Sequence, residues 1–181
     1  MKIAIAQLNP TVGHLTANAQ QILAAAQPAV QSGAQVLVTT ELALCGYPPR
    51  DLLMQPGFIQ AIATQLAQLA QALPPELAVF VGTVTTNPDA AQAGEKPLHN
   101  SAALLQHGRV QQVFHKQLLP TYDVFDEARY FQPGAGDQRV TLDGVTLGVT
   151  ICEDLWNDAD FWGKRAYGVD PLERLAQAGV E

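Results

Sequence analysis

The first forty residues alternate between two short apolar runs and one periodic segment, and this alternation limits the possible folds more than any other feature. Residues 2–8 and 36–40 have the length and apolar character of strands. Residues 18–32 carry apolar side chains at helical spacing, and Pro28 is expected to kink or break that helix. A strand, a helix and a second strand in this order predict a β-α-β unit with parallel strands.

The rest of the chain adds one helix and several strands. Residues 57–72 predict an amphipathic helix, and residues 77–85 predict a third strand. Two hairpins are expected: 102–106 with 109–115 around His107-Gly108, and 139–142 with 145–151 around Asp143-Gly144. A β-α-β unit joined to hairpins implies a mixed sheet with helices outside it, so the fold class is α/β or α+β.

The end of the chain predicts an interrupted domain. Asp170-Pro171 opens a helix that Gly179 ends, and Val180-Glu181 is expected to approach another strand. Stopping where a core strand should begin would leave an unpaired sheet edge. We therefore expect residues 1–181 to be the N-terminal part of a longer domain.

Composition and charge narrow the possible partners. The chain is 48% hydrophobic and 15% charged, and no apolar run approaches the ~18–20 residues that span a bilayer. A net charge of −7 argues against a nucleic-acid or anionic-membrane surface. Cys45 and Cys152 do not make a disulfide framework, so a reducing cytoplasm is expected. The partner should be a small molecule or another protein.

Three polar residues follow predicted strands directly: Glu41, Lys116 and Cys152. Strand alternation over 145–152 would place the Cys152 side chain away from the face of branched apolar residues. Taken singly, each has a plainer interpretation: a buried structural cysteine, or a solvent-exposed glutamate or lysine. Taken together, a thiol, a carboxylate and an ammonium group suit attack on a carboxamide.

Three segments resemble the nitrilase superfamily. Residues 41–53 (Glu-Leu-Ala-Leu-Cys-Gly-Tyr-Pro-Pro-Arg-Asp-Leu-Leu) resemble the segment around its catalytic glutamate. Residues 116–131 are similar to its lysine segment, and residues 148–156 (Gly-Val-Thr-Ile-Cys-Glu-Asp-Leu-Trp) to its nucleophile segment. The Gly-Tyr-Pro-Pro-x-Asp-Leu-Leu stretch is similar in particular to the glutaminase (carbon-nitrogen hydrolase) domain of glutamine-dependent NAD synthetase.

This resemblance implies a fold and a set of roles. The fold would be a four-layer α-β-β-α sandwich, here truncated before its last strands. Glu41 would be the general base, Lys116 the cationic stabiliser and Cys152 the nucleophile. Glu127 would orient the lysine and the base, and Tyr122 would contact the substrate.

The resemblance also implies partners. The substrate would be L-glutamine, with ammonia passing to a synthetase domain. No Ser-Gly-Gly-type ATP loop occurs here, so we expect no cofactor in this chain, with ATP and magnesium only in the absent synthetase domain. The four histidines are scattered and predict no metal site. A homo-oligomer is implied, as is little activity for the isolated chain.

Two alternatives and two structural expectations stand beside this interpretation. The chain could be another nitrilase-type amidase, or an inactive fragment with only an assembly or binding role. Cys45 is expected to be structural, and Trp156 and Trp162 are expected to cover the core.

Overall fold

The structure is a computed structural model that describes residues 1–136 and 138–180. Its centre is a five-stranded mixed sheet in the order β1-β2-β3-β4-β5. The first three strands are parallel, and β4 and β5 each pair antiparallel with the preceding strand. The strands are β1 (Ile3–Ile5), β2 (Val36–Val38), β3 (Ala78–Thr86), β4 (Leu98–Gln106) and β5 (Arg109–His115). The predicted β-α-β unit and first hairpin are confirmed.

Two long helices, α1 (Leu15–Gln31) and α2 (Pro56–Ala72), cover one face of this sheet. Their apolar stripes meet the inward side chains of β3 and β4 in the larger of two cores. The expected break at Pro28 is wrong, because α1 continues to Gln31 and Pro28 still accepts a hydrogen bond from the Ser32 N–H. The Pro28 side chain is exposed in the last turn of the helix, so its ring has room on the solvent side.

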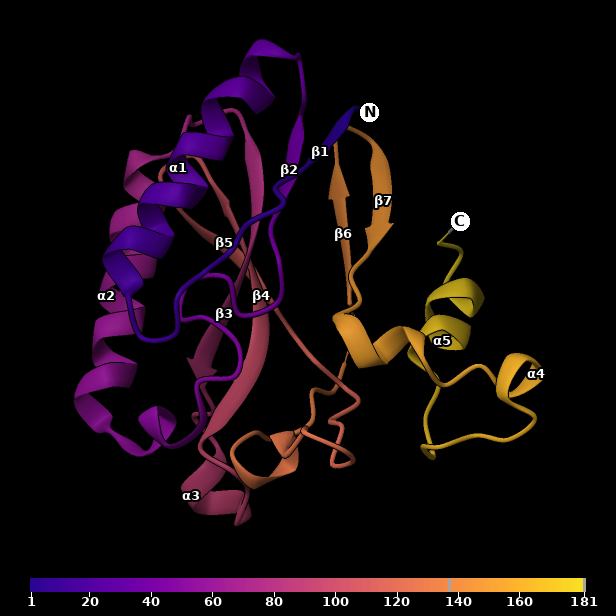
Figure 1. Ribbon diagram of the computed structural model, residues 1–181. Coiled ribbons are helices and arrows are strands. Elements are labelled where there is room, and N and C mark those ends of the chain that lie inside the picture. The colour runs from indigo at the N-terminus through magenta and orange to yellow at the C-terminus, as the bar shows by residue number, and fades with distance from the viewer. Residues whose placement is uncertain (137, 181) are drawn as a thin grey trace.

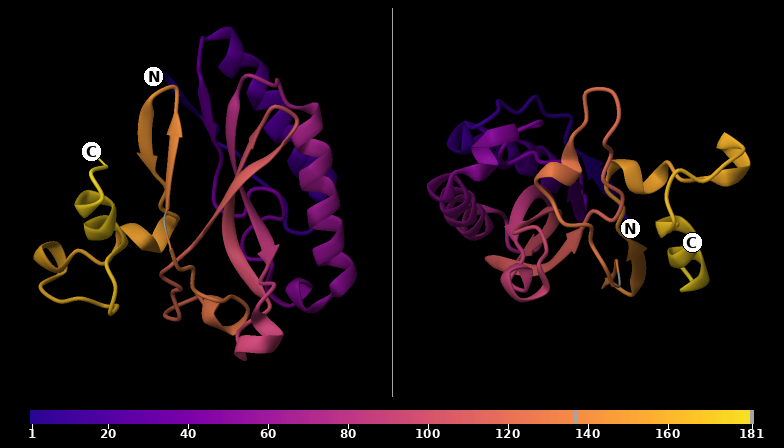
Figure 2. Two further views of the ribbon diagram at one scale, coloured as in Figure 1. Left: turned by 180° about the vertical axis from the view of Figure 1, so that it is seen from behind. Right: turned by 90° about the horizontal axis from the view of Figure 1, so that it is seen from below.

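The opposite face of the sheet meets a hairpin made of β6 (Arg139–Leu142) and β7 (Val145–Gly148) (Figures 1 and 2). Val140 and Leu142 pack there against a second core that contains Phe80 and Phe114. On the far side of the hairpin, α5 (Pro171–Gln177) places Leu175 against Gly148. The layers therefore follow the order helix, sheet, sheet, helix, as the four-layer expectation requires.

Several boundaries differ from the sequence-based expectation. The segment between the predicted strands 77–85 and 102–106 is partly structured, because it contains α3 (Ala90–Ala93) and the start of β4 at Leu98. The predicted strand 145–151 ends at Gly148. Short helical turns complete the chain: η1 (Arg50–Met54), η2 (Glu127–Arg129), η3 (Cys152–Leu155) and α4 (Ala159–Trp162).

Three remaining expectations concern the end of the chain and its surface. Trp156 and Trp162 do not cover the core, because they are 53% and 51% exposed. The expected approach to a further strand at Val180-Glu181 falls partly outside the described residues. Within the described residues, no helix combines the length and the apolar character that membrane crossing needs.

Candidate active site

Glu41 lies in a tight turn that follows β2 and rests on β3. The turn needs a left-handed backbone at Leu42, whose φ is +49°. Gly82 makes room for it, since a Cβ at Gly82 would lie 2.3 Å from the Thr40 carbonyl oxygen and 2.4 Å from the Leu42 nitrogen. The Leu44 N–H also donates to the Gly82 carbonyl at 2.9 Å. The glycine in β3 thus allows the turn to hold the Glu41 carboxylate over the sheet.

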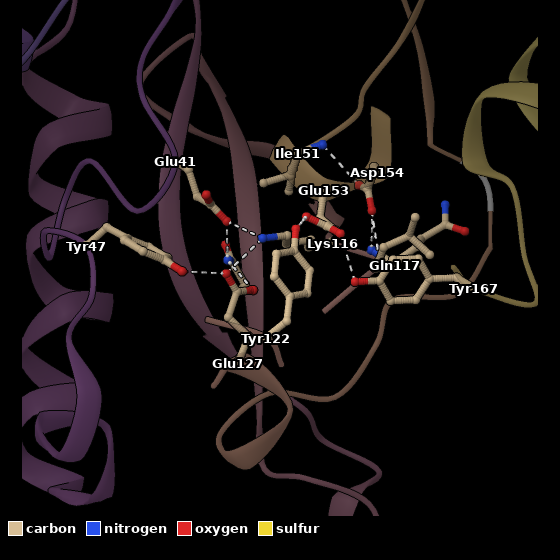
Figure 3. Close-up of polar contacts among 12 residues, drawn as sticks. Glu41, Tyr47, Lys116, Gln117, Tyr122, Glu127, Ile151, Glu153, Asp154 and Tyr167 are labelled. Carbon is tan, nitrogen blue, oxygen red and sulfur yellow. Dashed lines mark hydrogen bonds and ion pairs between the residues drawn. The ribbon is translucent and has the colours of Figure 1, made fainter. Parts of the chain in front are cut away.

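Lys116 follows β5 and has no exposed side-chain surface. Its Nζ lies 2.7 Å from Oε1 of Glu41 and 2.9 Å from Oε1 of Glu127, which comes from η2 (Figure 3). An ammonium group has three N–H donors, so one remains after these two bonds. The structure thus brings together the predicted base, cation and supporting glutamate.

Electrostatics explain how these charges coexist in the interior. Desolvation alone would lower the pKa of Lys116, but the charges and hydrogen bonds of Glu41 and Glu127 outweigh it and raise that pKa. Desolvation raises the pKa of Glu127, and the Lys116 ammonium opposes this rise. Lys116 therefore stays cationic at neutral pH and is the counter-charge for both carboxylates.

Two further residues complete this cluster, and the sequence did not predict either. The Asn100 Nδ2 donates to Oε1 of Glu41 at 2.7 Å and to Oε2 of Glu127 at 3.3 Å. The Asn100 Oδ1 is buried without a hydrogen-bond partner among the described residues. The Tyr47 hydroxyl donates to Oε1 of Glu127 at 2.9 Å, and burial is the largest cause of its raised pKa. The neighbours of Asn100 in β4, His99 and Ser101, are polar as well, so the sequence carried no distinct signal for it.

Cys152 opens η3 and is exposed. It lines a cavity of about 330 Å³ between the two sheets together with Glu41, Leu147 and Val149. Gly148 and Thr150, on the predicted side, and Leu147 and Val149, on the other side, all line this cavity. Because β7 ends at Gly148, strand alternation no longer assigns a side to Cys152, and that expectation stays a prediction. The backbone of Cys152 has a φ of +46°, an uncommon conformation for a residue with a side chain.

The Cys152 thiol is predominantly protonated at neutral pH. Desolvation is the largest cause that raises its pKa to about 11. The Glu41 carboxylate adds to this rise through its charge and as a hydrogen-bond partner of the thiol, whereas Lys116 opposes it. The arrangement is a thiol paired with a carboxylate, so the carboxylate can take the proton when the sulfur attacks.

The two acidic residues after Cys152 are both buried and have different partners. Glu153 accepts hydrogen bonds from the hydroxyls of Tyr122 and Tyr167, each at 2.8 Å. Within the part of the chain that the structure describes, Asp154 accepts only from backbone N–H groups, which lie on two segments. Tyr122, the predicted substrate contact, is 53% exposed and lies beside η3, the nucleophile turn that begins at Cys152 (Figure 3).

Cys45 differs from Cys152 in its access to solvent. It is fully buried, and burial raises the pKa of its thiol to about 12. This position agrees with a structural cysteine. Across residues 1–136 and 138–180, no three His, Cys, Asp or Glu side chains gather in a group that could hold a metal ion.

A thiol, two carboxylates and a buried lysine between two facing sheets define a class of amide-cleaving enzymes. Residues 2–161 match the family model described as carbon-nitrogen hydrolase, and this range includes Glu41, Lys116 and Cys152. The chain belongs to the carbon-nitrogen hydrolase family.

Individual relatives are more specific. The chain is 52% identical over 178 residues to a glutamine-dependent NAD(+) synthetase of Synechocystis, covering 98% of this chain and 32% of that protein. It is 36% identical over 161 residues to a glutamine-dependent NAD(+) synthetase of Thermotoga maritima, covering 88% of this chain and 27% of the relative. The chain thus spans about a third or less of the length of these relatives.

Solved structures agree with this assignment. Glutamine-dependent NAD+ synthetase from Acinetobacter baumannii, solved with ADP, superposes with a TM-score of 0.83 at 32% identity, over 99% of this chain and 30% of that one. An amidase of the nitrilase superfamily from Nesterenkonia superposes with a TM-score of 0.70 at 24% identity, over 86% of this chain and 57% of that one. The second likeness supports the nitrilase-type fold.

Proposed function

We propose that this chain is the glutaminase part of a glutamine-dependent NAD synthetase and supplies the residues that hydrolyse the side-chain amide of L-glutamine through a cysteine thioester, with little turnover when the chain is isolated. The observation that carries the proposal is the placement of Lys116 between Glu41 and Glu127, next to a cavity that Cys152 and Glu41 both line. The identity to synthetases over 98% of the chain supports glutamine as the substrate.

The first half of the reaction would form the thioester. The Cys152 sulfur attacks the carboxamide carbon while Glu41 takes the thiol proton. The resulting oxyanion accepts hydrogen bonds from the remaining Lys116 N–H and from the backbone N–H of Glu153. One such donor is typically worth ~3–4 kcal/mol in the transition state. Glu41 then gives its proton to the nitrogen, the carbon–nitrogen bond breaks, and ammonia leaves.

The second half would regenerate the thiol. Glu41 removes a proton from water, which attacks the thioester carbon, and the sulfur leaves as the proton returns to it. One glutamine and one water thus give glutamate and ammonia. This chain supplies the nucleophile, the base and the cation itself. We propose that ATP and magnesium act only in a synthetase domain that consumes the ammonia.

Covalent capture of the nucleophile tests this proposal. The folded chain is treated with the diazoketone analogue of glutamine, and the intact mass and the modified peptide are determined. We expect one adduct, at Cys152, that free L-glutamine suppresses more strongly than simple aliphatic amides do. Glu41→Gln and Lys116→Met should each abolish the adduct.

Two other outcomes would contradict the proposal in different ways. Suppression by simple amides as efficient as that by glutamine would indicate a general nitrilase-type amidase. No adduct, or equal labelling of Cys45 and Cys152, would mean that the chain forms no working site and has only an assembly or binding role.

A further inference from the structure

The carboxylate of Asp154 joins the two segments that carry Lys116 and Cys152. Its Oδ1 accepts hydrogen bonds from the backbone N–H groups of Gln117 and Leu118, each at 2.9 Å. Its Oδ2 accepts from the Ile151 N–H at 3.0 Å (Figure 3). The first two donors directly follow Lys116, and the third directly precedes Cys152. One side chain therefore holds the backbone directly after Lys116 and directly before Cys152.

The lysine side of this link is held by other backbone bonds as well. The Lys116 N–H donates to the Asn100 carbonyl at 2.9 Å, and the Lys116 carbonyl accepts from the Gly134 N–H at 2.7 Å. The first contact anchors Lys116 to β4, and the second joins it to the segment that leads to β6. The Asp154 carboxylate connects the residues after Lys116 to the turn that carries Cys152.

The cysteine side is a strained turn that needs such support. Cys152 has a φ of +46°, a conformation that persists in a residue with a side chain only where its surroundings impose it. Asp154 closes the turn reciprocally, because its own N–H donates to the Ile151 carbonyl at 3.1 Å while its Oδ2 accepts from the Ile151 N–H. The strained residue lies inside this closed ring.

The chemistry of Asp154 fits positioning rather than contact with a substrate. Its side chain is buried, and the residue is 2% exposed. Desolvation raises its pKa, against the lowering effect of the three backbone N–H donors. Hydrogen bonds from backbone N–H groups to a carboxylate are charge-assisted and directional. The three donors that the structure describes for this carboxylate are all backbone N–H groups, so the carboxylate fixes the backbone positions of the two segments.

We propose that Asp154 is a positioning residue that sets the separation between the Cys152 sulfur and the Lys116 ammonium. The inference rests on the proposed function only in taking Cys152 as the nucleophile. Since Lys116 lowers the pKa of the Cys152 thiol, a displaced Lys116 should raise that pKa further. The thiol itself therefore reports the separation without any glutamine chemistry.

The test is the pH profile of Cys152 alkylation by iodoacetamide, followed by peptide mapping. In Asp154→Asn one carboxylate oxygen becomes an N–H₂ group, so a donor faces a donor on at least one of the two segments. We expect the midpoint of the profile to move to higher pH and the rate at pH 8 to fall about three- to tenfold, since one pKa unit is a tenfold change in thiolate. A profile equal to that of the unmodified chain, or shifted to lower pH, would overturn the proposal, even if the melting temperature falls.

Asp158→Asn is the matched control. The Asp158 carboxylate also accepts from two backbone N–H groups, those of Asp160 at 2.9 Å and Phe161 at 3.2 Å, but at an exposed helix start away from Lys116. We expect the alkylation profile of this variant to match that of the unmodified chain. A shift as large as that in Asp154→Asn would show that the effect is unspecific, and the positioning role would fall.

A milder change keeps the test decisive if Asp154→Asn does not fold. Replacing Leu118 by its α-hydroxy acid turns one amide into an ester and removes a single N–H donor to Asp154. A smaller shift of the midpoint in the same direction supports the proposal, and an unchanged profile refutes it. Failure of the glutamine analogue to react would leave this result intact, so the two proposals fail separately.

Discussion

At the scale of single residues, the site depends on one cation shared by two carboxylates. Lys116 has no exposed side-chain surface and bonds to both Glu41 and Glu127. Glu41 has a second task, because it is also the hydrogen-bond partner that raises the pKa of the Cys152 thiol. The resting state therefore protects the sulfur from unwanted reactions, and proton transfer to Glu41 makes it reactive only when a substrate is in place.

This double role of Glu41 predicts opposite effects on two reagents. In Glu41→Gln the negative charge is lost, so the pKa of the Cys152 thiol should fall from about 11. Alkylation by iodoacetamide at pH 8 should then rise, by up to about tenfold per unit of pKa. Labelling by the diazoketone analogue should disappear, because that reaction needs a proton donor. Parallel changes with both reagents would contradict the assignment of Glu41 as the base.

Replacing Asn100 should affect both the stability of the fold and the labelling of Cys152, whereas a matched control should affect stability alone. Asn100→Leu leaves Glu41 and Glu127 without their amide donor, so we expect a stability loss of ~1–3 kcal/mol and at least about tenfold slower labelling of Cys152 by the analogue. Asn87→Leu is the control, because the Asn87 Nδ2 also donates to a carboxylate, that of Glu95 at 2.9 Å, in a surface loop. It should cost stability without changing the labelling rate per folded molecule. Equal labelling in both variants would remove Asn100 from the site.

At the scale of elements, local patterns predicted most of the fold, and pairing partners account for the misses. Helical spacing gave α1 and α2, and tight-turn residues gave both hairpins. The start of β4 at Leu98 was missed because its polar residues look like a loop, although β3 pairs with them as far as Thr86. The end of β7 at Gly148 was missed because β6 offers a partner only from Arg139 to Leu142. Strand boundaries of this kind depend on pairing partners far away in the sequence, and local periodicity carries no information about those partners.

The residues of the candidate site also fall into those that local sequence predicted and those that only the structure reveals. Residue types at predicted strand ends brought out Glu41, Lys116 and Cys152, and family resemblance added Glu127 and Tyr122. The structure gathers the first two with Glu127. Asp154 and Asn100 were missed because their importance lies in partners from distant segments, and a sequence does not show which backbone groups a side chain meets.

The turn that carries Glu41 predicts a position at which one methyl group is harmful. Gly82→Ala places a Cβ against the backbone of Thr40 and Leu42, which has no room to yield. We expect a loss of ~1–3 kcal/mol in urea unfolding together with loss of Cys152 labelling by the analogue. Gly57→Ala is the control, because its Cβ meets nothing within 4 Å. Gly82→Ala with unchanged labelling would show that the turn is not held as described.

At the scale of the whole molecule, two cores share the central sheet. The larger core joins the sheet to α1 and α2, and the smaller one joins it to the β6–β7 hairpin. The cavity that Glu41 and Cys152 line lies between the sheets, and the pair of Lys116 and Glu127 is buried beside Glu41. Homo-oligomer formation, a cytoplasmic location and further strands beyond residue 181 stay predictions.

Enclosure of these charges predicts a pH-dependent stability defect. Lys116→Met leaves the buried Glu127 and its neighbour Glu41 without a counter-charge, which should cost on the order of 3 kcal/mol near pH 7. Because Lys116 lowers the pKa of Glu127, that already raised pKa should rise further in the variant. A carboxyl group with a raised folded-state pKa destabilises the fold as pH increases through that value. The defect should therefore shrink as pH falls toward 5.

Urea unfolding between pH 5 and 8 measures this dependence. Lys96→Met, which changes an exposed lysine, is the control and should show no such trend. A loss in Lys116→Met that is constant across this range would mean that the buried carboxylate does not respond to its lysine.

Because Cys45 is buried, its thiol can report local opening of the segment that carries Glu41. Its sulfur lies in the segment that leads from Glu41 to Gly46 and has no contact with solvent. A thiol reagent can modify it only while that segment has detached from β3. Once Cys152 has been blocked, the remaining free thiol is that of Cys45. The rate at which a thiol reagent modifies it therefore measures how often the segment that carries Glu41 opens locally.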